Sequence, residues 1–379
     1  MVTENRYHSY HRKELPLGCR YCVKGEKLVL FVTGICPRHC YFCPVSDHKS
    51  QKDLIFANER EVTSSQDIIK EAELMRAKGA GITGGDPLTK IDRVVEYIQL
   101  LKQHFGKEFH IHLYTSLNLV TEEILKQLFE AGLDEIRFHL DLESKLLWNK
   151  LSLAREFSWK VGVEIPLIPT KEKETFEVLE FVKDKIDFLN LNELEIADNA
   201  QSKLSDMGFC VKDEQSYAIA GSLELGLKIL EYADKKELEL PIHTCTAKLK
   251  DSVQLANRLK REAEGAKLPF DLVDEEGMLT RGALYLPELV PGFEYRQKLK
   301  SMDMSKFVAV LKPLLERVKK ELRLTELDLY LDEKKPRILL SKSKIKQNRA
   351  LFKRLKLIPA IVTEYPTADQ LEVEVELFE

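Results

Sequence analysis

The sequence lacks a run of apolar residues long enough to span a membrane, and its first residues, MVTENRYHSYHRKELPLG, lack the apolar core of a secretory signal. We therefore expect a cytoplasmic protein with no membrane span. The chain also lacks a strong charge bias, because 58 Lys and Arg face 62 Asp and Glu, for a formal net charge of -4. Such a balance excludes bulk attraction to nucleic acid or to a membrane, so any such partner would need a local patch.

Cysteine is scarce, at seven in 379 residues, which is too few for a disulfide scaffold. Five of the seven, however, lie between Cys19 and Cys43. Clustered cysteines in a cytoplasmic protein indicate metal binding more often than disulfides. The length allows one large catalytic domain and one smaller module.

From residue 28 onward, short β-branched strands alternate with amphipathic helices. The expected strands cover residues 28–34, 79–84, 109–115, 135–140, 161–168, 188–196 and 238–244. The expected helices cover residues 64–78, 90–104, 121–131, 143–157, 173–183 and 222–235. This alternation predicts a parallel sheet, and apolar strands such as LVLFV are typical of burial on both faces. The predicted fold class is α/β, with a full or partial (β/α) barrel.

The alternation ends near residue 267, where hairpin-like sequence and one long amphipathic helix follow. We expect three parts, which are an N-terminal arm at residues 1–27, the barrel at residues 28–266 and a small α+β module at residues 267–379. Within the last part, residues 334–356 contain no acidic residue. This basic stretch indicates RNA or another polyanion as a partner, with a solvated basic face as the alternative.

The strongest chemical signal is the segment CPRHCYFC, in which Cys36, Cys40 and Cys43 follow directly on the first expected strand. Iron–sulfur clusters are held by cysteine thiolates, and this tight spacing lets one loop bind one cluster. Three ligands would leave one iron open to another molecule, whereas a structural zinc site is closed by four protein ligands. A zinc site with a fourth ligand elsewhere, or three cysteines of the core, are the alternatives.

This spacing, with the aromatic Phe42 before the last cysteine, resembles the signature of the radical S-adenosylmethionine (SAM) superfamily, and in particular archaeal proteins related to the pyruvate formate-lyase activating enzyme. The resemblance covers about residues 28–200. It implies that Cys36, Cys40 and Cys43 bind a [4Fe–4S] cluster, that SAM occupies the open iron, and that Phe42 lies near the adenine. It also implies an electron donor such as ferredoxin or flavodoxin, and reductive cleavage of SAM to a 5′-deoxyadenosyl radical that abstracts hydrogen from a substrate.

A second match follows the second expected strand, where Gly84, Gly85 and Asp86 precede a proline. The superfamily has a Gly-Gly-Glu-Pro turn here that binds the methionine amino group of SAM, largely through backbone carbonyls, and glycines permit that close approach. The resemblance therefore places this turn at the SAM site and leaves a side-chain role for Asp86 open. An ordinary strand-to-helix turn is the alternative. The resemblance implies further contacts with SAM or substrate at later strand ends, namely Thr115, Ser116, His139, Asp141 and Glu164.

A second metal site is suggested by the C-x-x-C pair Cys19 and Cys22, with Gly25 close behind it. His243 and Cys245 offer two more ligands, and the four side chains would complete a Cys₃His zinc site that resembles a zinc knuckle. An auxiliary iron–sulfur cluster and unligated buried cysteines are the alternatives. In a simple barrel the two segments would lie at opposite ends, which counts against a shared site.

Three functions stay open on the sequence alone. A radical SAM enzyme that acts on RNA or on a protein partner is favoured, because the cysteine loop and the Gly-Gly-Asp turn are similar to those of the activases of glycyl-radical enzymes. No side chain of such an enzyme need act as a general base, and the reaction could be that of an oxidoreductase or a transferase. A radical SAM enzyme with a small molecule or lipid inside the barrel is the second function. A non-catalytic zinc-binding regulatory or scaffold protein is the third.

Overall fold

The computed structural model describes residues 3–378, and the chain divides into two compact units after Arg258. The division falls inside helix α8 (Ala256–Ala266), slightly before the expected end of the barrel. The N-terminal arm belongs to the first unit, where its strand β2 (Tyr10–Arg12) joins the main sheet. Within residues 3–378, no helix combines the length and the apolar character needed to cross a membrane.

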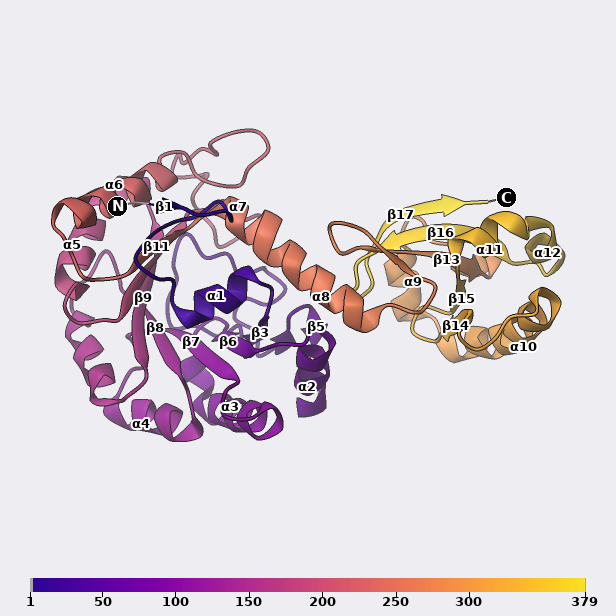
Figure 1. Ribbon diagram of the computed structural model, residues 1–379, viewed down its shortest axis with the longest axis horizontal. Coiled ribbons are helices and arrows are strands. Elements are labelled where there is room, and N and C mark those ends of the chain that lie inside the picture. The colour runs from indigo at the N-terminus through magenta and orange to yellow at the C-terminus, as the bar shows by residue number, and fades with distance from the viewer. Residues whose placement is uncertain (1–2, 379) are drawn as a thin grey trace. The chain divides into compact units, whose positions relative to one another are not determined.

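The first unit is built on one curved sheet whose parallel strands lie in chain order (Figure 1). These strands are β3 (Lys27–Phe31), β6 (Gly79–Thr83), β7 (His110–Ser116), β8 (Glu135–His139), β9 (Lys160–Leu167), β10 (Phe188–Glu193) and β11 (Ile242–Cys245). Short antiparallel strands complete the two edges, with β1 (Thr3–Glu4) and β2 beside β11, and β4 (Phe56–Ala57) and β5 (Arg60–Glu61) beside β3. The barrel is therefore partial, because β3 and β11 pair with these edge strands and not with each other.

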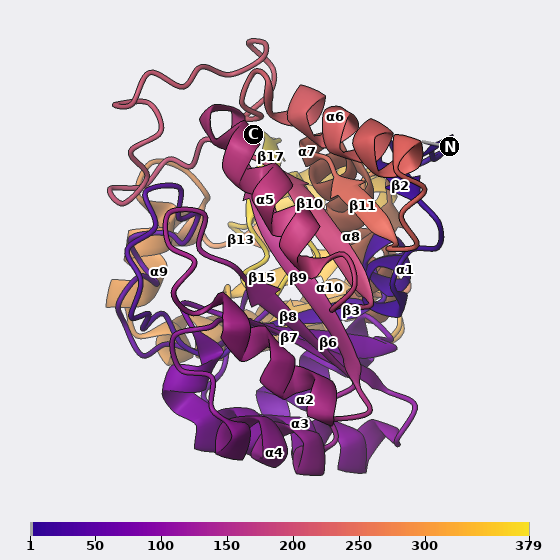
Figure 2. The same cartoon turned by 90° about the vertical axis from the view of Figure 1, so that its left-hand side faces the viewer.

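Helices cover the outer face of the sheet (Figures 1 and 2). They are α2 (Ser65–Leu74), α3 (Ile91–Phe105), α4 (Glu122–Ala131), α5 (Glu172–Val182) and α6 (Ser222–Lys235). The α-helix expected at residues 143–157 is a 3₁₀ helix at Trp148–Glu156. Its buried residues Trp148, Leu151 and Ala154 stand three apart, which matches the three-residue turn of a 3₁₀ helix.

Helix α1 (Leu17–Val23) lies on the inner side of the curved sheet (Figure 1). A Cβ atom on Gly18 would lie within 3 Å of the side chains of Arg137, His112 and Glu135. Helix α1 of the arm is therefore packed into the barrel interior. Because β2 pairs with β11, the arm also lies beside the segment that contains His243 and Cys245.

The second unit is an antiparallel sheet with helices, in agreement with the expected α+β module. Its strands are β12 (Leu272–Val273), β13 (Leu279–Tyr285), β14 (Leu329–Asp332), β15 (Arg337–Leu340), β16 (Ile358–Glu364) and β17 (Glu372–Leu377), and its helices after α8 are α9 (Tyr295–Ser301), α10 (Met304–Leu322), α11 (Lys342–Gln347) and α12 (Arg349–Arg354). Part of the basic stretch is buried and paired with acids. Arg337 contacts Asp332 and Glu364, and Lys335 contacts Glu372.

Candidate active site

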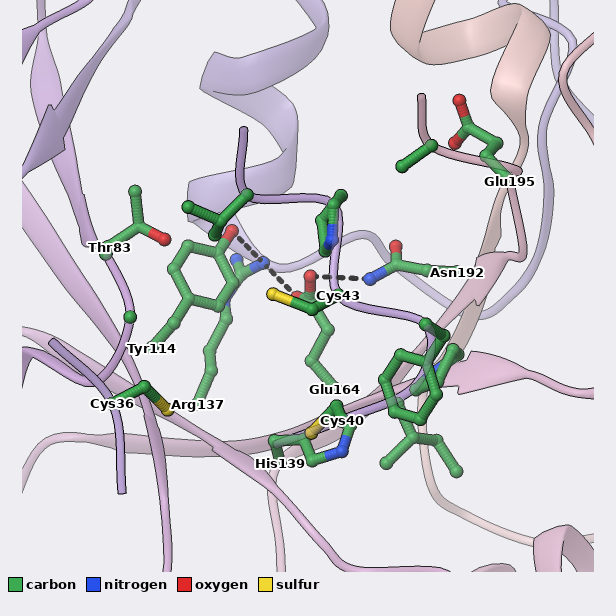
Figure 3. Close-up of a pocket in the computed structure, with 18 of the residues that line it drawn as sticks. Cys36, Cys40, Cys43, Thr83, Tyr114, Arg137, His139, Glu164, Asn192 and Glu195 are labelled. Carbon is green, nitrogen blue, oxygen red and sulfur yellow. Dashed lines mark hydrogen bonds and ion pairs between the residues drawn. The ribbon is translucent and has the colours of Figure 1, made fainter. Parts of the chain in front are cut away.

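One cavity of about 740 Å³ in the first unit is lined by most of the residues that the sequence singled out (Figure 3). The three thiols of Cys36, Cys40 and Cys43 share it with Phe42 and with the strand-end residues Gly84, Gly85, Asp86, Thr115, Ser116, His139 and Glu164. Because the carboxyl ends of parallel strands meet at one rim, residues from several strands converge here. The cavity is the candidate site.

The cysteine loop follows β3, and side chains from elsewhere in the chain donate hydrogen bonds to its backbone carbonyls. Gln51 donates through Nε2 to the Cys36 carbonyl at 3.1 Å, and Asn199 donates through Nδ2 to the Cys43 carbonyl at 2.9 Å. The Arg38 amide donates to the sulfur of Cys36 at 3.4 Å. The backbone is thus fixed from both sides of the loop, while the thiols stay free of disulfides.

The Gly-Gly turn packs directly onto the end of β3 and the start of the cysteine loop. The amide of Gly85 donates to the Thr33 carbonyl at 2.8 Å, and the amide of Asp86 donates to the Ile35 carbonyl at 2.9 Å. A Cβ atom on Gly84 or Gly85 would lie 2.4 Å from one of these same two carbonyl oxygens. Only glycine permits this approach, so the contact explains why both positions lack a side chain.

Asp86 is 2% exposed, and its carboxylate is occupied by groups of the protein itself. It accepts hydrogen bonds from the hydroxyls of Thr115 and Ser116, both at 2.7 Å, and from the amides of Leu88 and Ser116 at 3.1 and 3.2 Å. The structure therefore gives this side chain a positioning role that ties the turn to the end of β7. The hydroxyls of Thr115 and Ser116 likewise donate their hydrogen bonds to Asp86.

The rings of His139 and Phe42 are in contact at the rim, with centroids 5.8 Å apart and planes tilted by 41°. Burial lowers the pKa of His139 to about 4, so the ring is neutral near pH 7. Asp141 pairs with Arg38 at 3.2 Å and lines a smaller neighbouring cavity of about 260 Å³ together with the outer side of the cysteine loop.

Sequence reasoning found Glu164 but missed Arg137, which joins it to other polar residues that line the main cavity. Arg137 contacts Glu164 at 2.9 Å and Glu135 at 2.6 Å, and it donates to the Tyr114 hydroxyl at 3.2 Å. Asn192 donates to the other oxygen of Glu164 at 2.9 Å, as the dashed lines of Figure 3 show. A signal was present, because Glu135 and Arg137 alternate with apolar residues in one buried strand and must share a face.

The second group of cysteines lines the same cavity. Cys19 and Cys22 from α1 and Cys245 from the end of β11 all contribute to its wall, as does His243. Both ring nitrogens of His243 are hydrogen-bonded, Nδ1 with Asn190 at 2.7 Å and Nε2 with Ser9 at 3.1 Å. Burial lowers the pKa of His243 to about 3, so this ring is also neutral near pH 7.

In the part of the chain that the structure describes, no three His, Cys, Asp or Glu side chains are already placed as the ligands of one metal ion. This holds for both cysteine groups. In a [4Fe–4S] cluster each thiolate binds a different iron. The donor chemistry of Cys36, Cys40 and Cys43, on a fixed loop at the mouth of a cavity, fits such a cluster.

Comparison with known proteins decides the family. The profile of the radical SAM superfamily matches residues 30–145. A Methanocaldococcus jannaschii protein provisionally named as a glycyl-radical enzyme activating enzyme is 40% identical over 371 residues, which cover 95% of this chain and 92% of that protein. The chain belongs to the radical SAM superfamily. Membership implies an enzyme with a [4Fe–4S] cluster and SAM.

Other relatives are more distant. The GTP 3′,8-cyclase of Aliarcobacter butzleri is 24% identical over 309 residues, which cover 73% of this chain and 89% of the cyclase. Among solved structures, coproporphyrinogen III oxidase from Escherichia coli, a radical SAM enzyme, covers 91% of this chain and 94% of its own at 11% identity. The TM-score of this match is 0.36.

Replacing Asp86 with alanine should lower the free energy of unfolding of this radical SAM enzyme by about 3 kcal/mol or more, because buried donors from Thr115, Ser116 and Leu88 lose a charged acceptor. Asp86→Asn should cost less, since one oxygen remains. Urea unfolding of the apoprotein measures both values. Asp206→Ala, at an exposed loop position, is the matched control and should change stability by less than about 0.5 kcal/mol. Equal stability of Asp86→Ala and Asp206→Ala would contradict the assigned role.

Proposed function

We propose that this chain is a radical SAM activating enzyme that takes a hydrogen atom from a protein partner. The observation that carries the proposal is the similarity to the M. jannaschii protein, which runs through nearly the full length of both chains and includes the second unit. An activating enzyme acts on another protein and needs an external reductant. We propose that ferredoxin or flavodoxin supplies the electron.

Within this proposal Cys36, Cys40 and Cys43 hold the cluster. When bound, the cluster supplies one electron to the sulfonium of SAM and so generates the radical chemistry. The protein itself binds and orients the cluster and SAM, and it excludes water from the site. The fixed cysteine loop, held through the carbonyls of Cys36 and Cys43, sets the position of the thiolates.

The Gly84–Gly85 turn is proposed to bind the methionine end of SAM through its backbone. It lines the same cavity as the thiols, and its two glycines have no side chain that would cover the backbone. Asp86 supports this turn from behind through Thr115 and Ser116. Phe42 and the neutral His139 form an aromatic pair at the rim that suits an adenine ring.

Glu164 is proposed to contact the cofactor or the substrate, because it faces the cavity and is held from two sides by Arg137 and Asn192. Fixed polar groups of this kind give a site its orientation and specificity. Asp141 is less suited to this role, since it pairs with Arg38 and lines the smaller cavity.

RNA is less favoured as the substrate than a protein. Lys335 and Arg337, at the start of the basic stretch, are buried against Glu372 and Glu364, and Arg354 near its end pairs with Glu321. Charges neutralised in this way contribute little to phosphate binding. The exposed cations of this stretch that we would test with RNA are Lys342, Lys346, Arg349 and Lys353.

Cys40→Ala should abolish release of 5′-deoxyadenosine from SAM by anaerobically reconstituted, reduced enzyme, since a cluster that lacks one of three protein ligands cannot be held in place. Chromatography of the quenched reaction measures the product. Cys210→Ala, at an exposed cysteine outside both cysteine groups, is the control and should match the wild type. Equal release by Cys40→Ala and wild type would defeat the cluster assignment.

Deuterium transfer should identify the class of substrate. Reduced enzyme and SAM are incubated with extract of the source cells grown in deuterated medium, and 5′-deoxyadenosine is analysed by mass spectrometry. We expect 5′-deoxyadenosine to contain deuterium when the enzyme is incubated with the macromolecular fraction of the extract. Treating that fraction with protease should abolish the transfer, and treating it with ribonuclease should not. Transfer from the low-molecular-weight filtrate, or sensitivity to ribonuclease alone, would show a small-molecule or an RNA substrate instead.

A further inference from the structure

We propose that Cys19, Cys22 and Cys245 bind a second iron–sulfur cluster, separate from the one held by Cys36, Cys40 and Cys43. The inference concerns a different set of residues and does not depend on the identity of the substrate. It starts from the observation that all three thiols are free and line the same cavity as the first group.

The helix α1 is the first element of the site. Cys19 and Cys22 stand three residues apart in a helix, so their side chains lie on one face. That face is turned into the barrel, because both residues line the cavity and the Arg137 guanidinium lies 3.5 Å from the Cys19 sulfur. Two thiols on one helical face can supply two ligands to one cluster.

The end of β11 supplies the third thiol. Cys245 is paired in register with Asn192 of β10, and both residues line the cavity. Strand β2 of the arm pairs with β11, from Arg12 opposite Ile242 to Tyr10 opposite Thr244. The arm is therefore fastened beside Cys245, which removes the objection that the two segments lie at opposite ends of a barrel.

The turn after α1 is built to hold the helix against the chain that follows β11. Gly25 has a φ of +65°, and a Cβ atom there would lie 2.4 Å from the amide nitrogen of Arg258. Asn257 donates through Nδ2 to the Val23 carbonyl at 2.8 Å. Since only glycine tolerates both this backbone conformation and this contact, the sequence C-x-x-C-x-x-G is used here as one structural unit.

Donor chemistry favours an iron–sulfur cluster over a zinc ion. A structural zinc site needs four protein ligands, and the expected fourth ligand, His243, has both ring nitrogens in hydrogen bonds with Asn190 and Ser9. Three thiolates that face a cavity suit a cluster with one open iron, as in the first group. The Arg137 guanidinium lies 3.5 Å from the Cys19 sulfur and is itself fixed by Glu135 and Glu164, so a hydrogen-bond donor is held beside this ligand, as outer-shell groups at metal sites commonly are.

Metal content of the full-length protein, reconstituted anaerobically with iron and sulfide, tests the proposal. Two [4Fe–4S] clusters give about eight iron atoms per chain in the wild type and about four in the variant with Cys36, Cys40 and Cys43 all replaced by alanine. That variant keeps the second group intact, so it should retain iron and acid-labile sulfide while it loses SAM cleavage. Mössbauer spectra should assign the retained iron to a cluster.

The complementary variant, Cys19→Ser with Cys22→Ser and Cys245→Ser, should also hold about four iron atoms. Cys210→Ser is the matched control and should bind as much iron as the wild type. The proposal is overturned if the wild type holds one cluster only, or if the variant without Cys36, Cys40 and Cys43 holds no iron or holds a zinc ion in its place. These results do not need the complementary variant to fold. In the first variant, the iron content tests the second cluster, and the loss of SAM cleavage tests the cluster assignment of the proposed function. The two proposals can therefore fail separately.

Discussion

The contact between the Gly84–Gly85 turn and the end of β3 is the constraint on which the rest of the site depends. Two backbone hydrogen bonds, to the carbonyls of Thr33 and Ile35, join the turn to the first residues of the cysteine loop. With no side chain between them, the thiols and the turn share one wall of the cavity. Replacing this backbone contact by any side-chain contact would separate the thiols of the cysteine loop from the surface proposed to hold SAM.

The order of the strands places this contact beside the other residues of the site. Each parallel strand lies beside its predecessor in the chain, so the loops after β3, β6, β7 and β8 meet at one rim without long connections. The open edge matters as much, because β11 pairs with the arm strand β2 and not with β3. Helix α1 connects β2 to β3 along the inner side of the sheet, and this position brings Cys19 and Cys22 into the same cavity as Cys36.

Most of the barrel could be predicted from the sequence, because its strands are apolar, short and bounded by glycine or polar residues. Two parts could not. Residues 143–157 have apolar positions that suit an α-helix as well as a 3₁₀ helix, and burial at Trp148, Leu151 and Ala154 decided between them. The position of the arm depends on pairing between β2 and β11, which are more than 200 residues apart in the chain, and local patterns carry no information about such pairing.

The candidate site shows the same division between local and long-range information. The cysteine loop and the glycine turn are local motifs, and they were found. Arg137 was missed because a lone arginine in a strand gains its meaning from Glu164 and Tyr114, which other strands contribute. Asp86 stands where the superfamily has glutamate, and its shorter side chain ends at Thr115 and Ser116. A glutamate would extend one methylene further, whereas the carboxylate of Asp86 is fully used by hydrogen bonds within the protein, so it is the backbone of the turn that is proposed to bind SAM.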